Sequence, residues 1–258
     1  MTTLLVAGGV FAVLGMLIAW QIHRQLRNAG IVDVAWSSEV AMLAIFFSVF
    51  GSGWPMRRAA IGTVMAISGF RLAAYLLRDR VIGKAEDGRY VELRRGWGAR
   101  AGVRFFWFFQ AQALAALFFA LPAIVAAVNP EARWRPVELA ALALWLIAFA
   151  GETTADRQLV RFKADPANRG RTCRVGLWQY SRHPNYFFEW LMWVAYALFA
   201  LGSPWGVLAI ACPAVMLYLL FRVTGIPATE EQAVRTRGDD YRRYQQTTSA
   251  FVPWFPRR

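Results

Sequence analysis

The chain has 258 residues, of which 57% are hydrophobic and only 17% are charged. Soluble domains carry about 25% charged residues and disordered chains are poor in apolar side chains, so the composition excludes both classes and favours an integral membrane protein. A formal net charge of +13 is compatible with binding of a nucleic acid, an anionic lipid or a phosphorylated cofactor, and also with the basic cytoplasmic edge of a membrane protein.

Seven stretches approach the roughly 20 apolar residues that a membrane-spanning helix needs. The first is expected to be a retained helix and not a secretory signal, because basic residues follow it and none precedes it. The sequence therefore predicts an all-α, polytopic membrane protein with seven transmembrane helices. The predicted spans cover 4–20, 34–50, 59–77, 105–128, 137–150, 186–201 and 205–221.

Lysine and arginine are unevenly distributed between these spans. Segments 23–33, 78–104, 151–185 and 222–258 hold 24 of the 29 basic residues, and with seven spans they all fall on one side. Because positive residues accumulate in the cytoplasm, we expect a multi-pass inner-membrane protein with its N-terminus outside and its C-terminus inside. We expect one membrane domain, with 1–128 as the substrate half and 129–258, capped by cytoplasmic loops, as the cofactor half.

Metal and disulfide chemistry have little support in the sequence. Cys173 lies among arginines and Cys212 in an apolar run, a pattern that predicts neither a disulfide framework nor a thiolate site. His23 and His183 are the two histidines, so no zinc site is expected.

The acidic residues of the second span are candidate catalytic groups. Asp33 lies at its cytoplasmic border, where capping the helix is the alternative role. Glu39 lies deeper, where an ionised carboxylate costs a few kcal/mol on insertion scales, so we expect a neutral acid that can donate a hydrogen bond. A tyrosine could assist, and Tyr75 and Tyr90 are the candidates.

A basic, aromatic loop meets the start of the sixth span at 176–190. Pro184 suits a first helical turn, and Asn185 and Glu189 are four residues apart and share one helical face. The alternative for Glu189 is an interfacial ion pair with Arg182 or another arginine of the loop.

Two strings in the C-terminal half carry a resemblance to a known family. The first is Ser-Arg-His-Pro-Asn-Tyr-x-x-Glu-Trp, which begins at Ser181. The second lies in the tail and consists of three successive parts: Thr-Gly-Ile-Pro, then Glu-Glu, then Tyr-Arg-Arg-Tyr-x-x-x-Thr-x-x-Phe-x-Pro. Together with Glu-Asp-Gly-Arg-Tyr at 86–90, they resemble the membrane steroid 5α-reductase superfamily, in particular its bacterial branch. Arg-His-Pro-x-Tyr also occurs in isoprenylcysteine carboxyl methyltransferases, which generally lack the Asn185 and Glu189 equivalents.

The resemblance implies an NADPH site without a Rossmann motif. It implies that Asn185 and Glu189 hold the nicotinamide and that Asp156 lies near the adenosine. For any single arginine, positive-inside bias is the alternative, and for the acids of the tail it is helix capping. The other implied cofactor residues are Arg161, Lys163 and Arg174 at the phosphates, Tyr180, Arg182 and His183 in the motif, and Glu230, Glu231 and Tyr241 in the tail.

The expected function is NADPH-dependent reduction of the C=C bond of a lipophilic enone, such as a 3-oxo-Δ4-steroid. Relatives in the bacterial branch commonly have a small residue where this chain has Glu39, and the steroid-acting members have a glutamate in the second span. The alternatives are methyl transfer from S-adenosylmethionine and a non-catalytic lipid-binding or transport role. Expected partners are the lipophilic substrate and membrane lipids, with no nucleic acid; the oligomeric state does not follow from the sequence.

Overall fold

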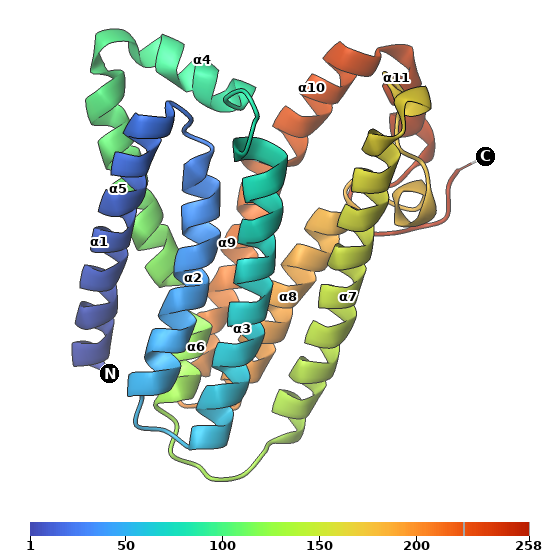
Figure 1. The fold of residues 1–258 in the computed structure, drawn as a ribbon. Helices are drawn as coiled ribbons and strands as arrows, with labels where there is room; N and C mark the ends of the chain where they lie inside the picture. Colours follow the sequence, from blue (N-terminus) through green and yellow to red (C-terminus); the bar gives the residue numbers. More distant parts are fainter. Residues whose placement is uncertain (224, 258) are drawn as a thin grey trace. The chain divides into compact units, whose positions relative to one another are not determined.

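The computed structural model describes residues 1–223 and 225–257, and within these ranges the regular elements are helices with no β-strand (Figure 1). Thr224 of the tail motif and Arg258 lie outside the described residues. By its contacts the chain divides into two units. The first comprises Met1–Arg135 and Phe199–Ala209, and the second comprises Pro136–Leu198 and Ile210–Arg258.

The helices of the first unit follow the apolar stretches of the sequence, with one break. Where the sequence predicts one continuous span over 105–128, the structure has two helices that meet at Ala120. Pro122 explains the break, because proline in a helix interior removes a hydrogen-bond donor and clashes with the preceding turn. The helices are α1 (Thr2–Leu26), α2 (Ile31–Phe50), α3 (Pro55–Leu76, continued by a π-turn over Leu77–Val81), α4 (Gly88–Trp97, followed by a 3-10 turn over Gly98–Arg100), α5 (Ala101–Phe119) and α6 (Leu121–Ala127).

Helix α2 lies at the centre of this unit and packs against α3, α1, α5 and α6. Figure 1 shows α1 beside α2 and α5, and α4 running at a steep angle to α5. A Cβ atom added at Gly8 of α1 would lie 2.6 Å from the Phe47 ring of α2 and 3.5 Å from Leu117 of α5. Small residues at membrane-helix interfaces allow such close approach.

Segment 199–209 joins the first unit through polar contacts. Asn129 donates from Nδ2 to the Gly202 carbonyl at 3.1 Å and to the Ser203 hydroxyl at 3.0 Å. Arg57, which is fully buried, donates to the carbonyls of Glu131 at 2.6 Å and Arg133 at 2.7 Å. A buried arginine is tolerated here because backbone oxygens receive its N–H groups.

In the part of the second unit that the structure describes, two helices are long and three are shorter. A Cβ atom added at Gly151 of α7 would lie 2.5 Å from the Phe188 ring of α8, so this glycine permits close packing of the two helices. The helices are α7 (Pro136–Ala164), α8 (Pro184–Leu201), α9 (Ala211–Arg222, preceded by a 3-10 segment over Gly206–Ile210), α10 (Ile226–Arg237) and α11 (Asp239–Thr247). Short 3-10 turns at Pro166–Asn168 and Gly176–Gln179 lie in the connection from α7 to α8.

Within the described residues, six helical stretches are long and apolar enough to cross a membrane, which supports the prediction of an integral membrane protein. The predicted count of seven is not confirmed. The segment expected as the sixth span forms α8, but it is not among the six, since Pro184, Asn185 and Glu189 lower its mean hydropathy. The six are Thr2–Leu26, Ile31–Phe50, Pro55–Val81, Gly88–Phe119, Pro136–Ala164 and Gly206–Arg237.

Candidate functional site

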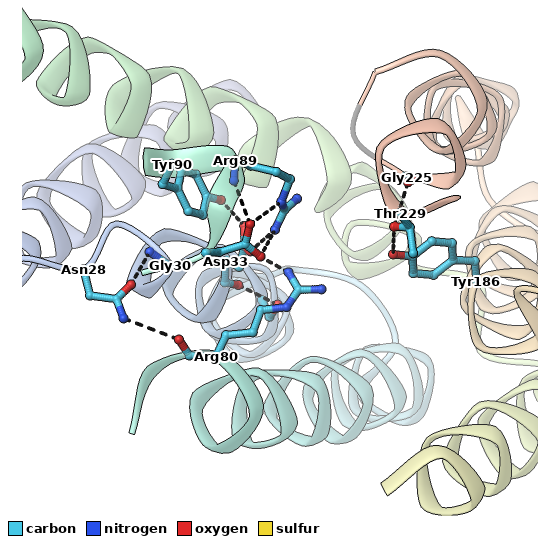
Figure 2. Close-up of polar contacts among 11 residues, drawn as sticks. Asn28, Gly30, Asp33, Arg80, Arg89, Tyr90, Tyr186, Gly225 and Thr229 are labelled. Atoms are coloured by element: carbon cyan, nitrogen blue, oxygen red, sulfur yellow. Dashed lines mark hydrogen bonds and ion pairs between the residues drawn. The ribbon is translucent and has the colours of Figure 1, made fainter. Parts of the chain in front are cut away.

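Asp33 lies at the centre of a polar cluster at the start of α2 (Figure 2). Tyr90 of α4 donates its hydroxyl to Asp33 Oδ1 at 2.7 Å. Arg80 and Arg89 donate to Asp33 Oδ2 at 2.8 Å and 3.2 Å. The structure thus brings together two of the three predicted catalytic residues, Asp33 and Tyr90, and the Tyr90 proton is directed at the carboxylate.

The same edge of the unit is held by Glu86 and Asp87. Glu86 accepts from the Ala29 amide at 2.7 Å and from Arg94 at 2.7 Å. Burial opposes ionisation of Glu86, but these donors hold its pKa below the usual range. Asp87 is the N-cap of α4 and accepts from the Arg89 amide at 3.0 Å. The Glu-Asp-Gly-Arg-Tyr element therefore fastens α4 to the start of α2.

Glu39, the third predicted catalytic residue, has different surroundings. Glu39 is a residue of α2, and it is buried, with an exposed fraction of 2%. Among the described residues, neither carboxyl oxygen has a hydrogen-bond partner. A Cβ atom added at Gly15 of α1 would lie 2.7 Å from Glu39 Oε1, so the glycine makes room for this carboxyl group. Unpaired buried polar groups are costly and rare in native proteins, which makes Glu39 a candidate ligand contact.

In the second unit, Asn185 and Glu189 lie one turn apart on α8, and each residue is partly buried. The amide of Asn185 donates to Asp156 Oδ1 on α7 at 3.4 Å. The structure therefore brings Asn185 and Asp156 together, and their expected contacts with the nicotinamide and the adenosine stay predictions.

Glu230 of α10 contacts two side chains of the Ser-Arg-His-Pro loop, Arg182 and His183. Arg182 donates from Nε to Glu230 Oε1 at 2.6 Å, and His183 Nε2 lies 3.2 Å from the same oxygen. Gln245 of α11 donates to Glu230 Oε2 at 2.9 Å, and Tyr241 donates to Oε1 at 3.4 Å. Burial, with the charge of Glu230, raises the pKa of Tyr241, which keeps its hydroxyl a donor.

Arg182 is fixed by the backbone as well. Its NH1 group donates to the carbonyls of Gln245 at 2.9 Å and Thr248 at 2.6 Å. Within residues 1–223 and 225–257, the acceptors of the Arg182 guanidinium are therefore Glu230 and these two carbonyls, and not Glu189. Glu231, by contrast, is exposed and pairs with Arg235 at 2.6 Å one turn along α10, a surface arrangement outside the Glu230 cluster.

The remaining predicted cofactor residues lie on α7 and in the connection from α7 to α8. The Tyr180 carbonyl accepts from the Trp254 amide at 2.9 Å, which fastens the aromatic tail to the loop. Arg174 donates to the side chain of Asp240 at 2.8 Å, so part of its charge is already neutralised. Arg161 and Lys163 are exposed near the end of α7.

The sequence did not predict two residues of these contacts: Gln245, which donates to Glu230, and Asp240, which accepts from Arg174. No local pattern marks them, because Asp240 lies 66 residues from Arg174, and Gln245 lies 15 residues from Glu230 on a different helix. Gly15 was not predicted either, and a glycine inside an apolar helix was the available signal.

Comparisons with known proteins identify a family. The model of the family described as "Protein of unknown function (DUF1295)" matches residues 19–248. The chain belongs to this DUF1295 family. The family is grouped with steroid 5α-reductase-like families. The chain is also similar to an uncharacterized protein, C594.04c, of Schizosaccharomyces pombe, with 24% identity over 92% of this chain and 76% of that protein. No solved structure matches the chain.

Proposed function

We propose that this DUF1295 protein is an NADPH-dependent reductase of the C=C bond of a lipophilic enone, with 3-oxo-Δ4-steroids as the leading substrate class. The observation that carries the proposal is Glu39. A carboxyl group that is buried in an apolar helical unit and lacks a protein partner is suited to donate a hydrogen bond to a ligand oxygen.

The side chains of the second unit fit a dinucleotide. Asn185 offers an amide beside Asp156 and next to Glu189, a set that can pair with the donor and acceptor atoms of a carboxamide. Exposed basic residues near the end of α7 and in the following loop can pair with phosphates. These are Arg157, Arg161, Lys163, Arg169, Arg171 and Arg174.

NADPH, when bound, supplies a hydride to the β carbon of the enone. Glu39, as a neutral acid, donates a hydrogen bond to the carbonyl oxygen. That oxygen gains negative charge as the enolate forms, so the bond strengthens in the transition state and lowers the barrier. The enolate then takes one proton from the solvent at its α carbon, which completes the saturated ketone. Asn185 and Glu189 orient the carboxamide, and the apolar helices around Glu39 exclude water from the reacting bond.

In this proposal the protein lies in the inner membrane with its N-terminus outside and its C-terminus in the cytoplasm. The one-sided distribution of Lys and Arg supports this orientation. It also supports access of a cytoplasmic, phosphorylated cofactor to the basic segments.

Binding of nucleotides to the purified protein tests the cofactor directly. We expect NADPH to bind at least tenfold more tightly than NADH at moderate salt, because exposed arginines can pair with the 2′-phosphate. S-adenosylmethionine should not compete with it. Equal affinity for NADPH and NADH, or preferential binding of S-adenosylmethionine, would contradict the proposal, and the second result would favour a methyltransferase.

A further inference from the structure

A second polar side chain inside the first unit has the same unusual surroundings as Glu39. Gln110 lies on α5, and both its amide nitrogen and its amide oxygen are buried with no hydrogen-bond partner among the described residues. A buried amide without a hydrogen-bond partner is destabilising in a folded protein. Within the described part of the chain, single nitrogens of Trp20, His23 and Arg58 are also buried and unpaired in this unit, but Glu39 and Gln110 each have both terminal polar atoms unpaired, which indicates polar groups kept for a ligand.

The packing of α5 on α1 places Gln110 along α1. Phe106 contacts Trp20 of α1 with ring centroids 5.3 Å apart. Leu117 lies 3.5 Å from the Cβ positions of Gly8 and Gly9. Gln110 is four residues after Phe106 and seven before Leu117, so it lies on the same helical face, between these two contacts.

The same register brings Gln110 to the level of Glu39. Along α5, Gln110 lies four positions after Phe106, which is about one helical turn. The same distance along α1, from Trp20 toward its N-terminus, leads to Met16 and Gly15. Gly15 is the residue that makes room for the Glu39 carboxyl group. Side chains from α2 and α5 therefore converge on one level of α1.

We propose that Gln110 is a second substrate-binding residue and that it shares one carbonyl oxygen of the substrate with Glu39. A carbonyl oxygen has two lone pairs, and it can accept one hydrogen bond from the Glu39 carboxyl O–H and another from the Gln110 N–H. Two donors on one oxygen form an oxyanion hole. This inference rests on the proposed function and adds Gln110 as a second hydrogen-bond donor to the carbonyl oxygen of the substrate.

A binding series without turnover tests the inference separately from the reaction. The probes are a saturated steroid ketone, which cannot be reduced at a C=C bond, and the hydrocarbon of the same skeleton. The variant is Gln110→Leu, and the matched control is Gln112→Leu, a glutamine two residues along the same helix whose polar atoms are not among the buried unpaired ones.

Gln110→Leu should weaken binding of the ketone about tenfold, and it should leave binding of the hydrocarbon unchanged. It should also raise the unfolding temperature of the free protein, because an unpaired buried amide is removed. Gln112→Leu should do neither. Unchanged ketone affinity in Gln110→Leu, or a lower unfolding temperature with equal losses for both probes, would overturn the inference by making Gln110 structural.

Failure of the proposed reaction gives a different result. If no enone consumes NADPH but the ketone-selective loss occurs, the reductase proposal fails and the polar binding pair stands. If enones are reduced and Gln110→Leu keeps wild-type affinity for the ketone, the reductase proposal stands and Gln110 has no part in binding.

Discussion

Asp33 and Glu39 occupy one helix, but their carboxyl groups have opposite surroundings. Asp33 receives hydrogen bonds from Tyr90, Arg80 and Arg89, and its side chain is 24% exposed. Glu39 is 2% exposed and has no partner among the described residues. The three donors occupy the carboxyl oxygens of Asp33, whereas an unpartnered buried carboxyl group such as that of Glu39 can donate a hydrogen bond to a ligand. We therefore assign the substrate contact to Glu39 and a fastening role to Asp33.

Glu189 gives a prediction at the same scale. Glu189→Ala should lower turnover at least a hundredfold while leaving the unfolding temperature within a few degrees of the wild type, because we assign Glu189 to orienting the nicotinamide. Steady-state turnover together with thermal unfolding checks this. Normal turnover in the variant would reduce Glu189 to an interfacial residue.

At the scale of elements, α10 and α11 are fastened to the Ser-Arg-His-Pro loop through Glu230. The side chains of Arg182 and Glu230 are 11% and 15% exposed, so their ion pair is mostly removed from water. A mostly buried pair depends on both partners, since the loss of one leaves the other charge uncompensated.

Neighbouring acids on α10 allow a matched test of this contact. Glu230→Ala should destabilise the protein by about 2–3 kcal/mol, because Arg182 loses a buried charged partner. Glu231→Ala removes a side chain that is 65% exposed and should cost less than about 0.5 kcal/mol. Thermal unfolding of both variants in detergent decides the point, and equal effects would show that Glu230 is not a structural centre.

The sequence predicted most helices because apolar length is a local signal. The break at Ala120 has a local cause in Pro122, but an apolar run of 24 residues hid it. The Glu230 cluster could be predicted only in part. Its members Arg182, His183 and Tyr241 lie in recognisable strings, whereas Gln245 and the backbone carbonyls that fix Arg182 depend on tertiary contacts between distant segments.

For the whole molecule, charge and hydropathy predicted a membrane protein, which the apolar helices support, and the count of seven spans stays a prediction. Helix α8 is just long enough to span a membrane, because its 18 residues reach about 27 Å, close to the thickness of the hydrocarbon core. Its first turns, however, carry the polar residues Asn185 and Glu189. The residues that we assign to cofactor binding are those that weaken its membrane signal. A functional helix end and an ideal membrane span require different side chains at the same positions.

Oxidation of NADPH by the purified protein with a 3-oxo-Δ4-steroid, compared among wild type, Glu39→Gln and Glu39→Leu, tests the central claim most directly. Glu39→Gln keeps a weaker N–H donor and should retain partial turnover, whereas Glu39→Leu should lose at least a hundredfold in turnover, and all three should bind NADPH equally. Steroid-dependent NADPH oxidation that follows this order is the predicted result. No oxidation by the wild type with any lipophilic enone, or full turnover by Glu39→Leu, would contradict it.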